Sequence, residues 1–465
     1  MTSHELPQEA LQKLRDQVSG SVVAPGDQGY DESRAVWNGM VDRRPAAVVR
    51  AADADDIAPT IGFAREHGLD LAVRGGGHNV AGNGSVDGGI VLDLGDLNRV
   101  SVDPASGTVT VEAGATLAHV DAATEPYGLV VPLGVISGTG VAGLTLGGGV
   151  GWLTRAHGLA ADNLVSVDLV TADGQHVTAS EAEHPDLFWA LHGGGGNFGV
   201  ATAFTFKAYP HGPRLYAGTF IYGQDRWRHA WAAFEDWTRE LPEQMTAITT
   251  TITPPPIAEM GDQPLLLLGF TWASTDRATG EALVRRLREL APPDDEEVGD
   301  TRWMEWQSAF DAVFPKGVRA YWRNTSFDRL DVDVIDVLVG RGSEQTWTGT
   351  GFDVHHMGGA FGRVAEEATP FPNRAARFWL NIYGFWTDPA DDDDRVAFVR
   401  GLSADMDPFA TGGEYVNFQG QERSGHRALD PRVVFGPTKY ERLVAVKRRY
   451  DPHNVFHINH NIPPG

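Results

Sequence analysis

The spacing of hydrophobic positions changes near residue 210. Before that point, short apolar runs alternate with stretches at helical spacing and with glycine-rich segments. This pattern predicts a strand-and-helix domain over residues 43–210, preceded by a lead-in at 1–42. The expected strands are 44–50, 71–73, 108–113, 164–171 and 198–209, and the expected helices are 8–18, 53–67 and 116–125.

Beyond residue 210 the predicted strands become longer and more aromatic, and they alternate with amphipathic helices. The strands are expected at 215–222, 247–253, 265–272 and 378–386, and the helices at 226–241, 276–290 and 331–340. This arrangement favours an antiparallel sheet covered by helices, an α+β second domain over residues 211–410. Residues 411–465 form a separate C-terminal segment.

Composition narrows the function classes. The net charge of -24 argues against nucleic acid and anionic membranes as partners. No apolar run approaches the length of a bilayer-spanning helix, and the N-terminus lacks the pattern of a signal peptide, so we expect a cytoplasmic protein. The chain has no cysteine, which excludes disulfides, thiol catalysis and cysteine-bound metals.

The first chemical motif is Arg74-Gly-Gly-Gly-His78-Asn79, which follows the apolar run 71–73. Consecutive glycines let the backbone approach a ligand closely. A histidine just beyond them presents a nucleophilic imidazole to that ligand. A lone histidine is most often a surface or core residue, but this context favours a functional one.

A second glycine-rich motif spans residues 134–152 and contains a formal GxGxxG from Gly138 to Gly143, with Asp162 about 20 residues further on. A dinucleotide fingerprint must open a helix, and four more glycines are expected to prevent one here. We therefore reject that interpretation. The alternatives are a plain surface loop and a cradle whose backbone N–H groups hold phosphate.

Three further motifs follow in order: 157–164, 186–200 with its glycine run, and the C-terminal stretch 415–463. Each motif also has a purely structural interpretation. The first would be a turn, the second a helix end followed by a loop, and the third ordinary helix and loop structure. His453, His457 and His460 lack carboxylate partners at useful spacing apart from Asp451, so no metal site is predicted.

Together the five motifs resemble the berberine-bridge-enzyme-like branch of the vanillyl-alcohol oxidase / p-cresol methylhydroxylase (PCMH) superfamily. The resemblance implies a PCMH-type FAD-binding domain at 43–210, a substrate domain at 211–410 and a C-terminal segment that returns to the FAD domain. It implies covalent FAD through an 8α linkage to His78. The family's second linking residue, a cysteine, falls on Ile136 here. The attachment is therefore expected to be single.

The resemblance also implies a set of cofactor-binding residues. They are Arg74, Gly75, Gly76, Gly77, His78, Asn79, Ile136, Ser137, Thr139, Gly140, Gly143, Gly147, Gly148, Gly149, Gly151, Gly158, Leu159, Asn163, Gly199, Val200, Tyr415 and Asn417.

The implied activity is that of an FAD-dependent oxidase. A hydride passes from an alcohol or amine carbon of a small substrate to flavin N5, and O2 is reduced to H2O2. The family's Tyr-x-Asn motif makes Tyr415 the expected base or substrate orienter, as a phenolate favoured by its neighbours. Tyr383 and Asn381 share one face of a predicted strand that lines the substrate cavity in the family. Asn381 cannot titrate, whereas some members carry an acid or base there.

Aromatic residues between 314 and 386 suggest an aromatic-lined cavity and a ring-bearing substrate, with core packing as the alternative. They are Phe314, Tyr321, Trp322, Trp347, Phe352 and Phe361.

Two other functions remain open at this point. One is an oxygenating flavoenzyme or an O2-independent dehydrogenase of the same fold, and the other is a flavin-binding protein without catalysis. We expect a monomer or small homo-oligomer, and the resemblance makes a role in secondary metabolism plausible.

Overall fold

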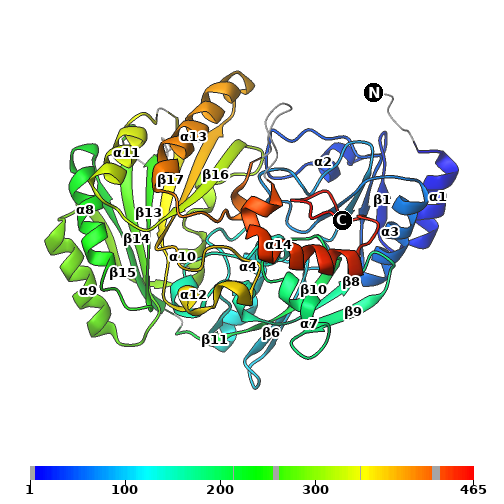
Figure 1. Ribbon diagram of the computed structural model, residues 1–465, viewed down its shortest axis with the longest axis horizontal. Helices are drawn as coiled ribbons and strands as arrows, with labels where there is room; N and C mark the ends of the chain where they lie inside the picture. Colours follow the sequence, from blue (N-terminus) through cyan, green and yellow to red (C-terminus); the bar gives the residue numbers. More distant parts are fainter. Residues whose placement is uncertain (1–5, 213, 255–260, 346, 421–429) are drawn as a thin grey trace.

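Three sheets of four or more strands and a long C-terminal helix organise the molecule (Figure 1). The computed structural model describes residues 6–212, 214–254, 261–345, 347–420 and 430–465. Two of the sheets belong to the part of the chain before residue 210, and the third belongs to the part after it. The predicted change of texture near residue 210 is therefore also a change of sheet.

The first sheet has four strands in the order β1-β2-β4-β3, of which β2, β4 and β3 run parallel and β1 antiparallel. Asp53 begins the helical turn before α3, because its side chain accepts a hydrogen bond from the backbone N–H of Asp55. The elements are α1 (Gln8–Gln17), β1 (Ser21–Val23), α2 (Tyr30–Arg34), β2 (Ala47–Arg50), α3 (Ile57–Glu66), β3 (Leu71–Arg74) and β4 (Ile90–Asp93).

The second sheet is antiparallel, in the order β5-β6-β10-β8-β9. Its strands are β5 (Val100–Asp103), β6 (Thr108–Glu112), β8 (Leu164–Val170), β9 (His176–Ser180) and β10 (Val200–Lys207). The helices α4 (Leu117–Thr124) and α7 (Pro185–Ala190) belong to the same part of the chain, as do the paired short strands β7 (Leu129–Val130) and β11 (Tyr209–Pro210).

The third sheet has seven antiparallel strands, ordered β15-β12-β14-β13-β17-β18-β16. These are β12 (Arg214–Tyr222), β13 (Met245–Thr253), β14 (Leu265–Trp272), β15 (Asp295–Arg302), β16 (Arg319–Phe327), β17 (Gly349–His356) and β18 (Phe378–Trp386). The helices between these strands and just after them are α8 (Trp227–Thr238), α9 (Arg277–Leu290), α10 (Trp303–Ser308), α11 (Val332–Ser343), α12 (Ala360–Arg363) and α13 (Asp392–Met406).

Helices cover one face of this third sheet, at the left of Figure 1. On α8, four large aromatic side chains recur at helical spacing and are buried in the core that this helix shares with the sheet: Trp227, Trp231, Phe234 and Trp237. The predicted α+β architecture, an antiparallel sheet covered by helices, is confirmed.

One prediction about the second motif is wrong. The glycines around residues 138–149 do not prevent a helix, because α5 (Val141–Leu146) begins just after Gly140 and ends at Gly147. Buried side chains such as Val141 and Leu146 hold this short helix, so tertiary packing overrides the weak propensity of glycine. The segment still differs from a dinucleotide fingerprint, because the preceding strand β7 pairs only with β11 and not within a parallel sheet.

The C-terminal helix α14 (Pro431–Tyr450), red in Figure 1, crosses the part of the molecule formed before residue 210. It is interrupted at Gly436, and its side chains Leu443 and Val446 pack in the same core as the first two sheets. Phe456 and Ile462 extend that packing to the chain end. None of the helices in the described residues is both long and apolar enough to cross a bilayer.

Candidate active site

A cavity of about 290 Å³ lies between the glycine-rich loops and the seven-stranded sheet. One wall consists of backbone from 75–77, 139–143 and 194–197. The C-terminal segment 456–460 closes one side, and side chains of β17 and β18 face the cavity from the sheet. The site therefore joins both parts of the chain.

Two glycine loops approach each other more closely than side chains would allow. A Cβ on Gly76 would lie 2.6 Å from the Cα of Gly140, and a Cβ on Gly140 would lie 2.5 Å from the backbone N of Gly76. By contrast, Gly143 and Gly196 line the cavity with nothing within 4 Å of their Cβ positions. The first and second motifs thus pack backbone to backbone and leave an open, backbone-lined cradle.

His78 and Ile136 both line this cavity. The ring of His78 stacks on Trp37 of the N-terminal lead-in, with centroids 4.6 Å apart. Burial lowers the pKa of His78 to about 4, opposed in part by a backbone hydrogen bond and by Asp311. The imidazole is therefore neutral at physiological pH, which is the form that can act as a nucleophile.

The structure places all six predicted residues of the first motif, 74–79, on the cavity wall. The predicted cofactor residues found there are Arg74, Gly75, Gly76, Gly77, His78, Asn79, Ile136, Thr139, Gly140, Gly143, Gly199, Tyr415 and Asn417. Nine others do not line it: Ser137, Gly147, Gly148, Gly149, Gly151, Gly158, Leu159, Asn163 and Val200.

The cofactor role of those nine stays a prediction, and packing accounts for several of their positions in the structure. A Cβ on Gly147 would lie 2.4 Å from Nδ2 of Asn417, and one on Gly148 would lie 2.4 Å from the Phe371 ring. The amide of Asn163 donates to the carbonyl of Leu159 at 2.8 Å. Glycines that admit a neighbouring side chain look the same in sequence as glycines that admit a ligand.

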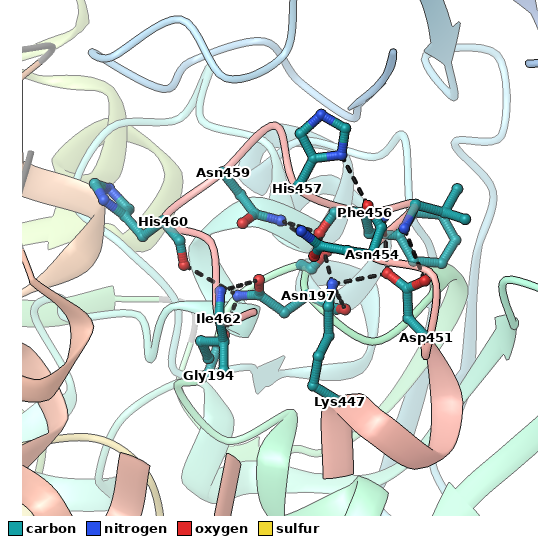
Figure 2. A network of polar contacts seen from close by, with 12 residues as sticks. Gly194, Asn197, Lys447, Asp451, Asn454, Phe456, His457, Asn459, His460 and Ile462 are labelled. Carbon is teal, nitrogen blue, oxygen red and sulfur yellow. Dashed lines mark hydrogen bonds and ion pairs between the residues drawn. The ribbon is translucent and has the colours of Figure 1, made fainter. Parts of the chain in front are cut away.

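The glycine run before Asn197 also lines the cavity, and a polar network holds it (Figure 2). Lys447 donates to the carbonyls of Asn197 and Phe456, both at 2.8 Å, and pairs with Asp451 at 2.7 Å. The Asn197 side chain accepts from the backbone N–H of Ile462 at 3.0 Å. The C-terminal segment thereby fixes the position of this loop.

A carboxylate that sequence reasoning missed faces the cavity from the sheet. Asp353 of β17 accepts a hydrogen bond from the hydroxyl of Tyr383 at 2.8 Å and from the amide of Asn381 at 2.8 Å, both on β18. His355 Nε2 lies 3.1 Å from the same carboxylate. Asp353, His355 and Tyr383 line the cavity, whereas Asn381 does not. Asn381 instead holds the carboxylate in position.

Tyr415 also lines the cavity, and its hydroxyl oxygen accepts from the backbone N–H of Gly149 at 3.2 Å and from Asn417 at 3.1 Å. These bonds favour the phenolate. Burial nevertheless raises the pKa of Tyr415, and burial together with Asp353 raises that of Tyr383 well above its ordinary value. A raised pKa favours the neutral phenol at both positions, and the phenolate role of Tyr415 stays a prediction.

Only some of the aromatic residues that were expected to line the cavity do so. Phe314 and Trp322 line the cavity, together with Phe310 and Phe418, which were not predicted. The other predicted aromatic residues lie in core clusters: Tyr321, Trp347, Phe352 and Phe361. Across the described ranges, no three or more histidine or acidic side chains gather in a way that could hold a metal ion.

Comparison with known proteins places the chain. An FAD binding domain family matches residues 45–180, and a berberine and berberine-like family matches residues 415–463. The FAD-linked oxidoreductase YgaK of Bacillus subtilis (strain 168) is 30% identical, covering 97% of this chain and 98% of its own length. This chain belongs to the berberine-bridge-like FAD-linked oxidoreductases.

Other relatives of this oxidoreductase are named oxidases. The (R)-6-hydroxynicotine oxidase of Paenarthrobacter nicotinovorans is 28% identical over 96% of this chain and 97% of its own. Among solved structures, a 6-hydroxy-D-nicotine oxidase from Arthrobacter nicotinovorans has a TM-score of 0.85 at 26% identity, covering 96% and 98% of the two chains. The xylooligosaccharide oxidase of Myceliophthora thermophila shares the fold, with a TM-score of 0.83 at 24% identity over 98% and 99%.

The cavity of this FAD-linked oxidase fits a large polar cofactor. The backbone cradle at Gly143 and Gly196 is open, as described above. In addition, two polar atoms on the same wall are buried without a hydrogen-bonding partner, Nε2 of His460 and Oδ1 of Asn459. Buried polar atoms without a hydrogen-bonding partner are rare in native proteins, and a bound ligand can supply the missing partner. The donor set of backbone and amide groups suits FAD, and the described residues would hold it along the glycine loops.

Proposed function

We propose that this oxidase carries FAD attached covalently to His78 alone and oxidises an alcohol or amine carbon of a small, ring-bearing substrate. The observation that supports this most strongly is the neutral imidazole of His78 in one cavity with the buried carboxylate of Asp353. Bound FAD would accept the substrate's hydride and pass the electrons to O2, which yields H2O2.

The family resemblance supports a single attachment. Ile136 stands where the family has a second linking cysteine, and an isoleucine cannot form that bond. The glucooligosaccharide oxidase of Acremonium strictum, which shares the fold, carries a 6-S-cysteinyl, 8α-N1-histidyl FAD, and this supports the histidyl link. In this chain only the histidine half of that pair is available.

On the substrate side, we assign the base to Asp353. Its carboxylate is buried, reaches the cavity and is held by three side chains, which is the arrangement a proton acceptor needs. The neutral phenol of Tyr415 accepts two hydrogen bonds and keeps its own hydrogen to donate, so it orients the substrate. Tyr383 keeps the Asp353 carboxylate in place.

The substrate class rests on the remaining wall. Trp322, Phe314 and Phe418 offer ring faces, and Nε1 of Trp322 and Oγ1 of Thr350 are buried without partners. Aromatic faces beside a carboxylate suit a cationic or hydroxylated ring. The relatives named for 6-hydroxynicotine are oxidases of a compound of that kind.

A denaturing mass spectrum of the purified holoprotein tests the attachment. The native chain should be heavier by one FAD, and His78→Ala should lose that mass. His453→Ala, an exposed histidine outside the cavity, is the matched control and should keep it. A native mass equal to the bare chain would contradict the covalent link.

Anaerobic mixing with a panel of cyclic alcohols and amines tests the activity. A substrate should bleach the bound flavin, and air should restore it with one H2O2 per product. Product without H2O2 would indicate a dehydrogenase, and oxygen in the product an oxygenase. A panel that never bleaches the flavin would favour a non-catalytic flavin protein.

A further inference from the structure

A second cleft, of about 370 Å³, lies away from the catalytic cavity. It is formed where α6 (Thr154–His157) meets the end of α8, the end of β17 and the segment 374–377. Its walls carry four arginines and one histidine: Arg155, Arg239, Arg374, Arg377 and His356. This concentration of positive charge occurs in a chain whose net charge is -24.

The charge of Arg155 has no counterion among the described residues. Its Nε donates to the carbonyl of Met245 at 2.8 Å, and its other nitrogens donate to the carbonyls of Leu241, Pro242 and Met357 and to His356. All of these acceptors are neutral. Burial lowers the pKa of Arg155 to about 10, which leaves the guanidinium charged at physiological pH.

The other three arginines of the cleft form ion pairs, but they share only two carboxylates between them. Arg374 forms a bidentate ion pair with Asp162, both contacts at 2.8 Å. Arg377 and Arg239 share one carboxylate, that of Glu235, at 2.8 and 3.0 Å. These three guanidinium groups thus form ion pairs with two carboxylates, whereas Arg155 pairs with none among the described residues.

His356 supplies an unused donor in the same cleft. Arginine can only donate, so Nε2 of His356 must accept the bond from Arg155 at 3.3 Å, and Nδ1 therefore carries the hydrogen. That Nδ1 is buried without a partner, in a side chain only 6% exposed. Nε of Arg374 is likewise buried and unpartnered. A native protein rarely leaves donors in this state, although neither nitrogen is exposed to the cleft as the side chains stand.

We propose that this cleft binds a small tetrahedral oxyanion, phosphate or sulfate, either as a free ion or as the terminal group of a phosphate ester. The anion would contact the arginines, offset the uncompensated charge of Arg155 and, once the His356 ring turns towards the cleft, accept its Nδ1–H. Because α6 belongs to the FAD-binding part of the chain and β17 to the other part, the ligand would also strengthen the junction between them. This site is independent of the proposed oxidation, so its test does not need a turning-over enzyme.

Isothermal titration calorimetry of the purified holoprotein tests the proposal, with inorganic phosphate, sulfate and glycerol phosphate at constant ionic strength set by chloride. We expect saturable binding of one equivalent and a rise in melting temperature that chloride alone does not give. Equal affinity for phosphate and its ester would identify a site for the free ion, and tighter binding of the ester would identify a site for a phosphorylated metabolite.

Two variants test the location. Arg239→Gln removes an exposed guanidinium from the cleft rim, and His356→Phe removes the orphan donor; each should weaken phosphate binding by about tenfold or more. Arg226→Gln, which changes an exposed arginine paired with Asp294 outside the cleft, is the matched control and should bind as the native chain does. No binding beyond that of chloride, or unchanged affinity in Arg239→Gln, would overturn the proposal.

Discussion

The buried ion pair at the end of α14 offers the sharpest test of how the C-terminal segment supports the active site. The side chains of Lys447 and Asp451 are both 0% exposed. Besides this contact, Lys447 donates to two backbone carbonyls, and Asp451 accepts from the backbone N–H groups of Val455 and Phe456, each at 2.8 Å. Replacing Lys447 by methionine keeps the length and the apolar stem but removes the only cation of this network (Figure 2).

The expected loss is large because the carboxylate stays buried. Breaking a buried pair by removing one partner costs about 3–5 kcal/mol. At roughly 2.1 cal/mol/K per residue, unfolding a chain of 465 residues carries an entropy of about 1 kcal/mol/K. Lys447→Met should therefore lower the melting temperature by about 3–5 °C.

Lys439→Met on the same helix is the matched control. Lys439 also pairs with a carboxylate, that of Glu366 at 2.5 Å, but the Glu366 side chain is 47% exposed. Water can solvate the carboxylate left behind, so the loss should be about 1 kcal/mol. Differential scanning calorimetry of both variants, side by side with the native chain, measures the difference.

Hydrogen exchange locates the effect. In Lys447→Met the amides of Phe456 and Ile462, which bond to Asp451 and Asn197, should exchange faster, together with those of the glycine loop 193–197. Equal melting temperatures for the two lysine variants, or unchanged exchange in these segments, would refute the view that this pair fixes the cavity wall.

Three further outcomes are expected. Burial raises the pKa of Asp121 to about 7, above its unfolded value of about 3.9, so its contribution to stability is full below about pH 4 and is lost as the pH rises towards 7. Asp121→Asn keeps an acceptor for Trp303 and should melt higher than the native chain at about pH 8, but not at about pH 4, in thermal scans. Asp353→Asn should lower kcat by about 10²–10⁴-fold without changing flavin content, and an unchanged kcat in an H2O2 assay would remove Asp353 from the mechanism. Trp37→Leu removes the ring stacked on His78 and should reduce the flavin-bearing fraction in a mass spectrum, and full incorporation would show that the stacking does not orient the imidazole.

Local pattern determined much of this protein. Period-two and helical spacing placed strands such as β13, β14 and β18 and helices such as α9 within a few residues, because each buries one face of its own sequence. The motif at residues 74–79 located the glycine wall and His78, since ligand approach by backbone needs consecutive glycines. The absence of cysteine is likewise a statement that the sequence makes alone.

Tertiary structure decided what these patterns could not. Asp353 meets Asn381 only because β17 and β18 pair in that register, and no local signal in either strand specifies the pairing. The glycines at 147–149 pack against side chains of distant segments and do not line the cavity, although their sequence resembles that of a cradle. Arg155 and His356 lie 201 residues apart, and only folding brings the guanidinium of one to the imidazole of the other. Sequence specifies each residue's chemistry and local conformation, whereas the neighbours that set its role come from packing across long separations.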